Sequence, residues 1–312
     1  MKSLTIGLVD LDTSHPGSFV PILRDMGHRV TAVYDTGEVN PPGYAARFAQ
    51  EHSIETACES LDQMAEQVDA VFISSCNWDV HVDRARPFIE AGVAVFIDKP
   101  MAGNRRDLMQ LVEWEKQGAT ITGGSSLRYV PEVREWAGKI AAEDWVYAMA
   151  GCAVDEFNYG IHAYTMLQGL LGAGIHEVRH IGTTGQHQIE LTWRDGRRGL
   201  LNVGKTKRYL PFYANVVAQQ EVGYFQVDSS RIYSSMLEAV CPYLAGEAPA
   251  PMAMEQLAEV ELSAIAAKIS IEKEGKPVKL EEVPMEYAGY DGKSFASYYK
   301  EMKYPSLKAG KS

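Results

Sequence analysis

The fold of this 312-residue chain is decided by one stretch, Ala91-Gly92-Val93-Ala94-Val95-Phe96-Ile97-Asp98-Lys99-Pro100. Its run from Ala94 to Ile97 is apolar throughout, as expected of a strand that is covered on both faces of a parallel sheet. The charged turn Asp98-Lys99-Pro100 ends the run. We therefore predict a buried strand over 94–97 and a domain that ends shortly after this turn.

Outward from this stretch, short β-branched runs alternate with helical patterns as far as about Gly123. Such alternation is typical of parallel βαβ units. The predicted strands are Leu4–Val9, Val30–Tyr34, Ile54–Ala57, Ala70–Ser74, Ala94–Ile97 and Thr120–Thr122. Ser60, with Gln63 three residues later, and Asn104 are expected to cap two of the helices. The sequence therefore predicts an α/β fold in which residues 1–123 form a doubly wound parallel sheet of the Rossmann type.

Beyond Gly124 the strand-like segments become longer, and we expect them to pair antiparallel. They are Val146–Val154, Val178–Thr183, Ile189–Trp193, Gly199–Val203 and Val222–Val227. Asp195-Gly196 predicts a tight hairpin turn in which both central residues have positive φ. Helices are expected over Arg231–Leu244 and Met254–Glu274. Residues 124–312 are therefore predicted to form an α+β domain with a large, mostly antiparallel sheet.

Charge and composition limit the partners of the chain. The formal net charge is −11 and the pI is about 5.3, so phosphate-rich surfaces would repel the protein. This argues against nucleic acid and membranes and favours a small-molecule substrate. The four cysteines are scattered without a Cys-x-x-Cys pair, which argues against disulfides and structural zinc. No signal peptide or ~20-residue apolar span is evident, so we expect a cytoplasmic protein.

Several motifs together resemble the Gfo/Idh/MocA family of oxidoreductases, named for glucose–fructose oxidoreductase and inositol dehydrogenase. They are Val68–Asn77, Ala91–Pro100, Gly123–Pro131, Asn158–His162 and, more weakly, Gly275–Val278. The family has Glu-Lys-Pro where this chain has Asp98-Lys99-Pro100. The resemblance implies that Lys99 lies beside the substrate hydroxyl and the nicotinamide, and that His162 takes the hydroxyl proton. It also places Ser75, Asn77, His81 and Asp98 beside the cofactor.

Elementary chemistry supports the same two residues. Removal of hydride from an alcohol carbon needs a base for the hydroxyl proton and a cation near the developing oxyanion. Apolar residues after His162 recur at helical spacing, which predicts a helix with one buried face and His162 in its first turn. A helix N-terminus disfavours imidazolium. From the residues alone, however, a lysine before a proline is usually solvated, and a lone histidine is usually a cap or a core residue.

Asn158 departs from the family pattern, which has aspartate four residues before the histidine. An amide cannot stabilise an imidazolium as a carboxylate does. Asp155 or Glu156 could replace it, although acidic residues before a helix are more often caps. Arg128, Tyr129 and Tyr159 are candidates for lining a sugar-like substrate site, or simply a cleft wall.

The first loop lacks the expected phosphate motif. After the strand, Asp10, Asp12 and His15 stand where Gly-x-Gly-x-x-Gly would have its glycines. In one account, the two carboxylates turn away to cap backbone amides, while Thr13, Ser14 and the helix N-terminus still hold a dinucleotide. In the other, the cofactor site is altered or lost, and these side chains bind substrate or a divalent metal.

Asp35 favours the first account. It ends the second predicted strand, about 25 residues after Asp10, near the ~20-residue offset of the acidic residue that binds ribose hydroxyls. Thr36-Gly37-Glu38 offers no cation for a 2′-phosphate, so NAD is favoured over NADP. A plain turn-forming role for Asp35 stays open.

Three hypotheses follow. The first is an NAD-dependent oxidoreductase that transfers hydride between nicotinamide and a secondary alcohol or ketone of a sugar, polyol or related molecule. The second is a lyase, epimerase or hydrolase on the same scaffold, and the third is a non-catalytic relative with an altered cofactor site. The resemblance also implies a homo-oligomer formed through the second domain.

Overall fold

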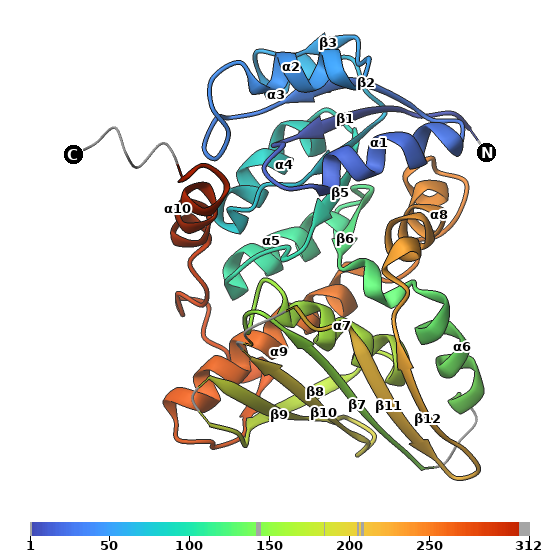
Figure 1. Cartoon of the computed structure of the whole chain (residues 1–312), viewed down its shortest axis with the longest axis vertical. Coiled ribbons are helices and arrows are strands. Elements are labelled where there is room, and N and C mark those ends of the chain that lie inside the picture. The colour runs from blue at the N-terminus through green and yellow to red at the C-terminus, as the bar shows by residue number, and fades with distance from the viewer. Residues whose placement is uncertain (1, 142–144, 184, 205, 207–208, 306–312) are drawn as a thin grey trace.

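The computed structural model describes residues 2–141, 145–183, 185–204, 206 and 209–305. Two sheets stand one above the other in Figure 1, and the C-terminal helix returns to the side of the upper one. No helix among these residues is both long and apolar enough to cross a membrane.

The first sheet has the order β3-β2-β1-β4-β5-β6, and every pair in it is parallel. Its strands are β1 (Thr5–Val9), β2 (Arg29–Tyr34), β3 (Thr56–Ala57), β4 (Ala70–Ile73), β5 (Ala94–Asp98) and β6 (Ile121–Gly124). Each predicted strand of this half is present, and β4 and β5 are buried along their whole length. The Rossmann prediction is confirmed. The strand order reverses between β1 and β4, which is where such sheets bind ligands.

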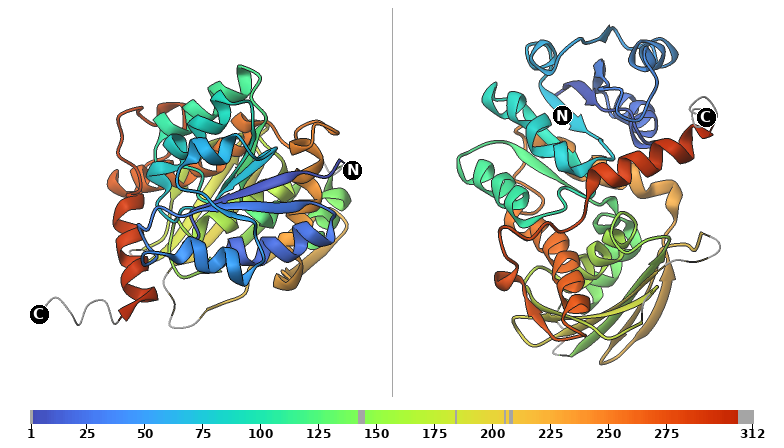
Figure 2. Two further views of the ribbon diagram at one scale, coloured as in Figure 1. Left: turned by 90° about the horizontal axis from the view of Figure 1, so that it is seen from above. Right: turned by 90° about the vertical axis from the view of Figure 1, so that its left-hand side faces the viewer.

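Helices cover both faces of this sheet, as the view from above in Figure 2 shows. They are α1 (His15–Asp25), α2 (Tyr44–Glu51), α3 (Leu61–Ala65), α4 (His81–Glu90) and α5 (Arg105–Lys116), with the 3-10 turns η1 (Trp78–Val80) and η2 (Ser126–Arg128). Both predicted caps are confirmed: Ser60 Oγ accepts a hydrogen bond from the Gln63 N–H, and Asn104 Oδ1 accepts one from the Asp107 N–H. Local capping chemistry therefore sets the start of α3 and α5.

The second sheet has the order β12-β11-β7-β10-β9-β8-β13. Its strands are β7 (Val146–Ala153), β8 (Ile175–His180), β9 (Gln186–Trp193), β10 (Arg198–Gly204), β11 (Tyr213–Ala218), β12 (Val222–Gln226) and β13 (Val278–Lys279). All pairs are antiparallel except β7 with β10, which confirms a mostly antiparallel sheet. Two strands, β11 and β13, were not predicted, and β8 begins before the predicted Val178.

The hairpin between β9 and β10 differs in detail from its prediction. Gly196 has φ +88°, but Asp195 is not among the residues with positive φ. The Trp193 N–H donates to the Arg197 carbonyl, so the turn is longer than two residues and needs a left-handed conformation only at the glycine.

The remaining helices are α6 (Pro131–Ile140), α7 (Gly160–Leu171), α8 (Ile232–Leu244), α9 (Met254–Glu272) and α10 (Gly292–Lys303), with η3 (Ser229–Arg231) and η4 (Leu280–Glu282). Helix α7 is buried on nearly every side, so the prediction of one buried face was wrong. Helices α6 and α9 pack against it in addition to the sheet. Helix α8 instead packs with α1 against the first sheet.

Candidate active site

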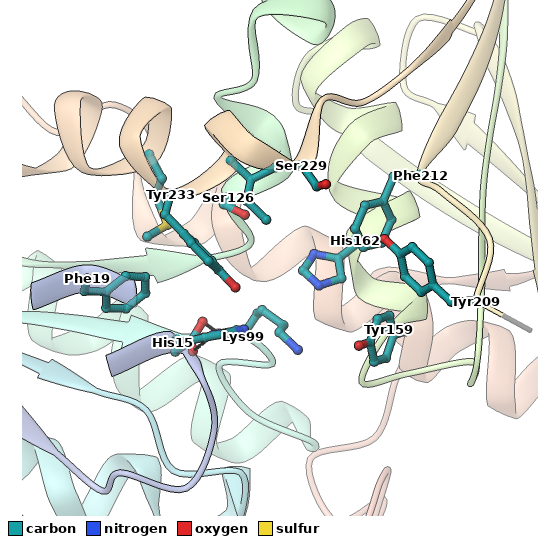
Figure 3. A pocket seen from close by; sticks show the side chains of 13 residues that line it. His15, Phe19, Lys99, Ser126, Tyr159, His162, Tyr209, Phe212, Ser229 and Tyr233 are labelled. Atoms are coloured by element: carbon teal, nitrogen blue, oxygen red, sulfur yellow. Dashed lines mark hydrogen bonds and ion pairs between the residues drawn. The ribbon is translucent and has the colours of Figure 1, made fainter. Parts of the chain in front are cut away.

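The candidate site lies where the carboxyl ends of β1, β4 and β5 meet the second domain. Parallel strands place their following loops at one edge of the sheet, which brings residues 10–15, 74–77 and 98–99 together. The start of α7 and the segment before it face this edge, and α8 closes one side (Figure 3). Both halves of the chain therefore build the site.

Lys99 and His162 line the same cavity of about 250 Å³, and Figure 3 shows both side chains directed into it. Its wall is largely aromatic, with Phe19, Tyr159, Tyr209, Phe212 and Tyr233. Ligand pockets usually measure about 300–1,000 Å³, so this space suits a small ligand. The resemblance-based prediction that these two residues share a site agrees with this placement.

Lys99 is held by the segment that precedes α7. Its ammonium donates to the Asn158 backbone carbonyl at 3.2 Å and to Asn158 Oδ1 at 3.1 Å, and it lies 5.6 Å from the centre of the Tyr159 ring. Burial lowers the pKa of Lys99, while the carboxylates of Asp98 and Asp155 oppose that shift. The result is a partly desolvated cation at the cavity wall, where its field is strong.

His162 lies in the first turn of α7, as predicted, but its partner is unexpected. Its Nδ1 lies 2.7 Å from Ser125 Oγ, whereas Asn158 contacts Lys99. Burial sets the pKa of His162 well below its ordinary value, and the cation of Lys99 and the His15 ring lower it further. His162 is therefore a neutral imidazole at physiological pH.

Asp155 does not replace the family aspartate. Its Oδ1 accepts from the backbone N–H groups of Phe157 and Tyr159 at 3.0 and 3.1 Å. It therefore caps the backbone before α7, which is the more ordinary of the two roles considered from the sequence.

His15 pairs with Asp98 across the edge of the sheet. Its Nδ1 is hydrogen-bonded to Asp98 Oδ2, and its ring centre lies 6.0 Å from that of Phe19 and 5.2 Å from that of Tyr233. Burial would raise the pKa of Asp98, but the His15 ring and the Lys99 ammonium hold it below its ordinary value. This pair lies on the wall of the cavity that contains Lys99.

The backbone of Asp10 has a conformation that is typical of glycine, although the residue carries a side chain. Its φ is +56°, in the left-handed region that the first glycine of such loops can adopt. Its carboxylate is turned inward, where it accepts from Thr36 Oγ1 at 2.9 Å and Ser75 Oγ at 2.5 Å. Arg84 Nε lies 3.3 Å away and balances the charge. The charge of Asp10 is therefore satisfied within the protein.

Asp12 and Asp35 are also turned to protein partners. Asp12 Oδ2 accepts from the Cys76 N–H at 2.9 Å, while its Oδ1 is buried without a partner. Burial, followed by repulsion from Asp10, raises the pKa of Asp12 to about 7. Asp35 accepts from the N–H groups of Leu11 and Gly37 and from Asn40 Nδ2. These contacts agree with the first account of the loop, in which the carboxylates cap backbone amides.

Helix α10 lies beside the loops at this edge of the sheet (Figure 2, right). Lys303 Nζ donates to the Asp12 carbonyl at 2.7 Å and to Asn40 Oδ1 at 2.8 Å, and Lys300 Nζ donates to the Glu38 carbonyl at 2.6 Å. The space left between the loops and the side chains of Phe295 and Tyr299 is about 90 Å³. A dinucleotide does not fit this space while α10 is seated.

The start of α1 is also a poorer phosphate site than a glycine loop. The N–H of His15 donates to Thr13 Oγ1 at 3.2 Å, and Pro16 has no N–H to offer. Thr13 and Ser14 nevertheless line the small cavity, together with Ser75. The loop therefore offers few donors to a dinucleotide, and α10 closes the space beside it.

Several predicted site residues lie elsewhere. Arg128 is buried and bonded to Gln168, and neither it nor Tyr129 lines the two cavities at this edge. Their contact with a substrate stays a prediction that this placement does not support. His81 is fully buried, with its ring nitrogens on the carbonyls of Met101 and Ser75. Asn77 Nδ2 donates to Glu38 Oε1 at 2.8 Å. These last two shape the loops rather than the cavity.

Other residues of the site escaped the sequence analysis. Tyr209, Phe212 and Tyr233 come from segments outside the motifs of the resemblance, and no local pattern marks them. Ser125 lies within Gly123–Pro131 but was not among the predicted site residues. The pairing of His15 with Asp98 joins residues 83 positions apart. Among the residues that the structure describes, no three His, Cys, Asp or Glu side chains gather to hold a metal ion.

Part of the chain is similar in sequence to known oxidoreductases. Residues 16–123 match the model of the "Oxidoreductase family, NAD-binding Rossmann fold". A Salmonella typhimurium protein that is described as an oxidoreductase, YceM, is 30% identical to this chain over 137 residues. This match spans only 43% of either protein.

Solved structures share the whole fold. A Desulfitobacterium hafniense oxidoreductase described as NADPH-dependent has a TM-score of 0.80 at 14% identity, covering 91% of this chain and 99% of that one. Lactobacillus casei myo-inositol dehydrogenase, solved with NAD(H) and myo-inositol, has a TM-score of 0.74 at 14% identity, covering 89% and 97%. At such identities the likeness shows the fold alone. The match to the Gfo/Idh/MocA oxidoreductase model covers residues 16–123 alone, so it relates this part of the chain to that family.

Proposed function

We propose that this protein is an NAD-dependent oxidoreductase that acts on a secondary alcohol or ketone of a polyol, sugar or related small molecule. The observation that carries the proposal is the joint placement of Lys99 and His162 on one aromatic-walled cavity at the carboxyl edge of a Rossmann sheet. The myo-inositol dehydrogenase of the same fold supports a polyol as the substrate class. Formation of a homo-oligomer and a cytoplasmic location stay predictions.

The residues of the cavity suit this chemistry. The Lys99 ammonium, fixed by Asn158, would stabilise negative charge on the substrate oxygen. His162 is neutral and faces the same space, so it would form a hydrogen bond with the substrate hydroxyl group. NAD, when bound, supplies the acceptor for hydride.

The first loop and the end of β2 would hold NAD once α10 has moved. Asp35 lies at the position suited to ribose hydroxyls, although its oxygens are now taken by Leu11, Gly37 and Asn40. The nearby carboxylate of Glu38 would repel a 2′-phosphate, which favours NAD over NADP. We therefore propose that α10 leaves its seat when the cofactor binds.

The test is turnover of a polyol panel with NAD, followed by the absorbance of the reduced nicotinamide. Lys99→Met should lower kcat/KM by about 100-fold or more, whereas Lys116→Met, which removes an exposed lysine on α5, should leave it unchanged. Absence of NAD binding, even in variants with weakened α10 contacts, would refute the proposal.

A second candidate function is favoured by the closed cofactor path. The cavity with Lys99 and His162 is open, while the dinucleotide path is filled by α10, so a lyase, epimerase or hydrolase that needs no free cofactor is also consistent with the site. Conversion of a keto-sugar without added NAD would support this function. Its absence, together with NAD-dependent turnover, would exclude it.

A further inference from the structure

Two departures from the family pattern meet in one hydrogen bond. His15 stands where the phosphate loop would have its third glycine, and Asp98 stands where the family has glutamate. In the structure, His15 Nδ1 is bonded to Asp98 Oδ2. The imidazole of His15, which a glycine at this position would lack, and the carboxylate of Asp98, which is one carbon shorter than that of glutamate, therefore form a histidine–carboxylate pair.

The charge of Asp98 fixes how this pair is protonated. The cationic Lys99 and the His15 ring keep the pKa of Asp98 low despite its burial, so its carboxylate only accepts hydrogen bonds. Nδ1 of His15 must then carry the proton that is donated to Asp98. In the neutral ring this leaves the lone pair on Nε2.

Nε2 of His15 is available to a ligand. No hydrogen bond joins it to another described residue, and the ring lines the cavity beside Lys99 and Tyr233. The aromatic rings of Phe19 and Tyr233, which also contact each other, pack against the imidazole. Figure 3 shows it on the cavity wall formed by the first domain.

His162 lacks the corresponding support. Its ring nitrogen is paired with a hydroxyl, Ser125 Oγ, and both burial and the nearby Lys99 ammonium disfavour an imidazolium at this position. Since the family aspartate is replaced by Asn158, which holds Lys99 instead, no carboxylate among the described residues stabilises a proton on His162.

We propose that His15, oriented by Asp98, is the acid/base residue of this cavity, and that His162 serves as a neutral hydrogen-bonding residue. In the oxidation direction, the substrate O–H and carbinol C–H bonds would both break. The proton would pass to His15 Nε2 and then to water, with the imidazolium stabilised by Asp98, and the NAD of the proposed function would supply the acceptor for the hydride. The identity of the reaction rests on the proposed function, whereas the histidine–carboxylate pair does not.

The activity test compares His15→Asn, Asp98→Asn and His162→Asn with His176→Asn, a control on β8. With NAD and a polyol that the wild type oxidises, His15→Asn should lower kcat by about 100-fold or more, and Asp98→Asn should also lower it. His162→Asn should act mainly on KM. Any rise of kcat with pH that comes from His15 should disappear in His15→Asn. The other titratable groups that face the site, Lys99, Asp98, Tyr233 and His162, are unchanged in this variant. Loss of kcat in His162→Asn with normal kcat in His15→Asn would overturn the proposal.

A second measurement needs no substrate. Nitrogen NMR of the labelled full chain, followed to a pH at which the ring is neutral, should show that the neutral His15 ring is protonated at Nδ1 and unprotonated at Nε2, and Asp98→Asn should change this tautomer. A neutral ring with its proton on Nε2 in the wild type would overturn the inference. If the tautomer is as expected but the wild type neither binds nor reduces NAD, the proposed function has failed and the histidine–carboxylate pair has not.

Discussion

Weakening the hydrogen bonds that hold α10 against the loops of the first sheet should tighten NAD binding. Lys303→Ala removes two hydrogen bonds, to the Asp12 carbonyl and to Asn40 Oδ1. Hydrogen bonds from charged groups contribute about 1.5–3 kcal/mol each when buried, but Lys303 is only partly buried, so we expect about 1.5 kcal/mol for the two together. Because the apparent Kd is the intrinsic Kd divided by the fraction of open protein, this corresponds to roughly tenfold tighter binding.

The assay is titration of NAD into the purified full chain, followed by quenching of tryptophan fluorescence or by calorimetry. Adding Lys300→Ala, which removes the bond to the Glu38 carbonyl, should lower the apparent Kd several-fold further. Lys293→Ala is the matched control, because this lysine is exposed on the same helix. Unchanged affinity in both lysine variants, or weaker binding in Lys303→Ala, would refute the idea that α10 competes with the cofactor.

Two further predictions concern the first loop. Arg84→Ala leaves the buried Asp10 carboxylate without its cation, so the free energy of unfolding should fall by about 2–3 kcal/mol in urea denaturation; a change below about 0.5 kcal/mol would contradict the pairing. The pKa of Asp12 is raised to about 7 by burial, so the folded state holds this proton more tightly than the unfolded chain and loses stability as pH rises through 7. The stability of Asp12→Asn relative to the wild type should therefore increase between pH 5 and 8, by roughly 4 kcal/mol at most. Burial also raises the pKa of Glu261 to about 7, but this residue is present in both proteins and its effect cancels in the comparison. An equal pH dependence of both proteins would contradict the prediction.

Much of the fold was predictable from the sequence because its signals are local. The apolar run of β5 and the caps at Ser60 and Asn104 depend on residues within a few positions of one another. Strand β13 has two residues and is too short for any periodic signal. The polar and apolar residues of β11 (Tyr213–Ala218) alternate only weakly, and its place beside β7 comes from the sheet.

The amino-acid pattern alone predicted the Rossmann sheet, the resemblance to the Gfo/Idh/MocA oxidoreductases and the candidate residues Lys99 and His162. The surroundings of these two residues became known only from the packing of distant segments. The partners of His15 and of the Asp12 loop lie 83 and 291 residues away, and such contacts form because parallel strands end at one edge and the chain returns there at α10. Local sequence patterns do not predict these contacts, because the contacts depend on how distant segments pack together.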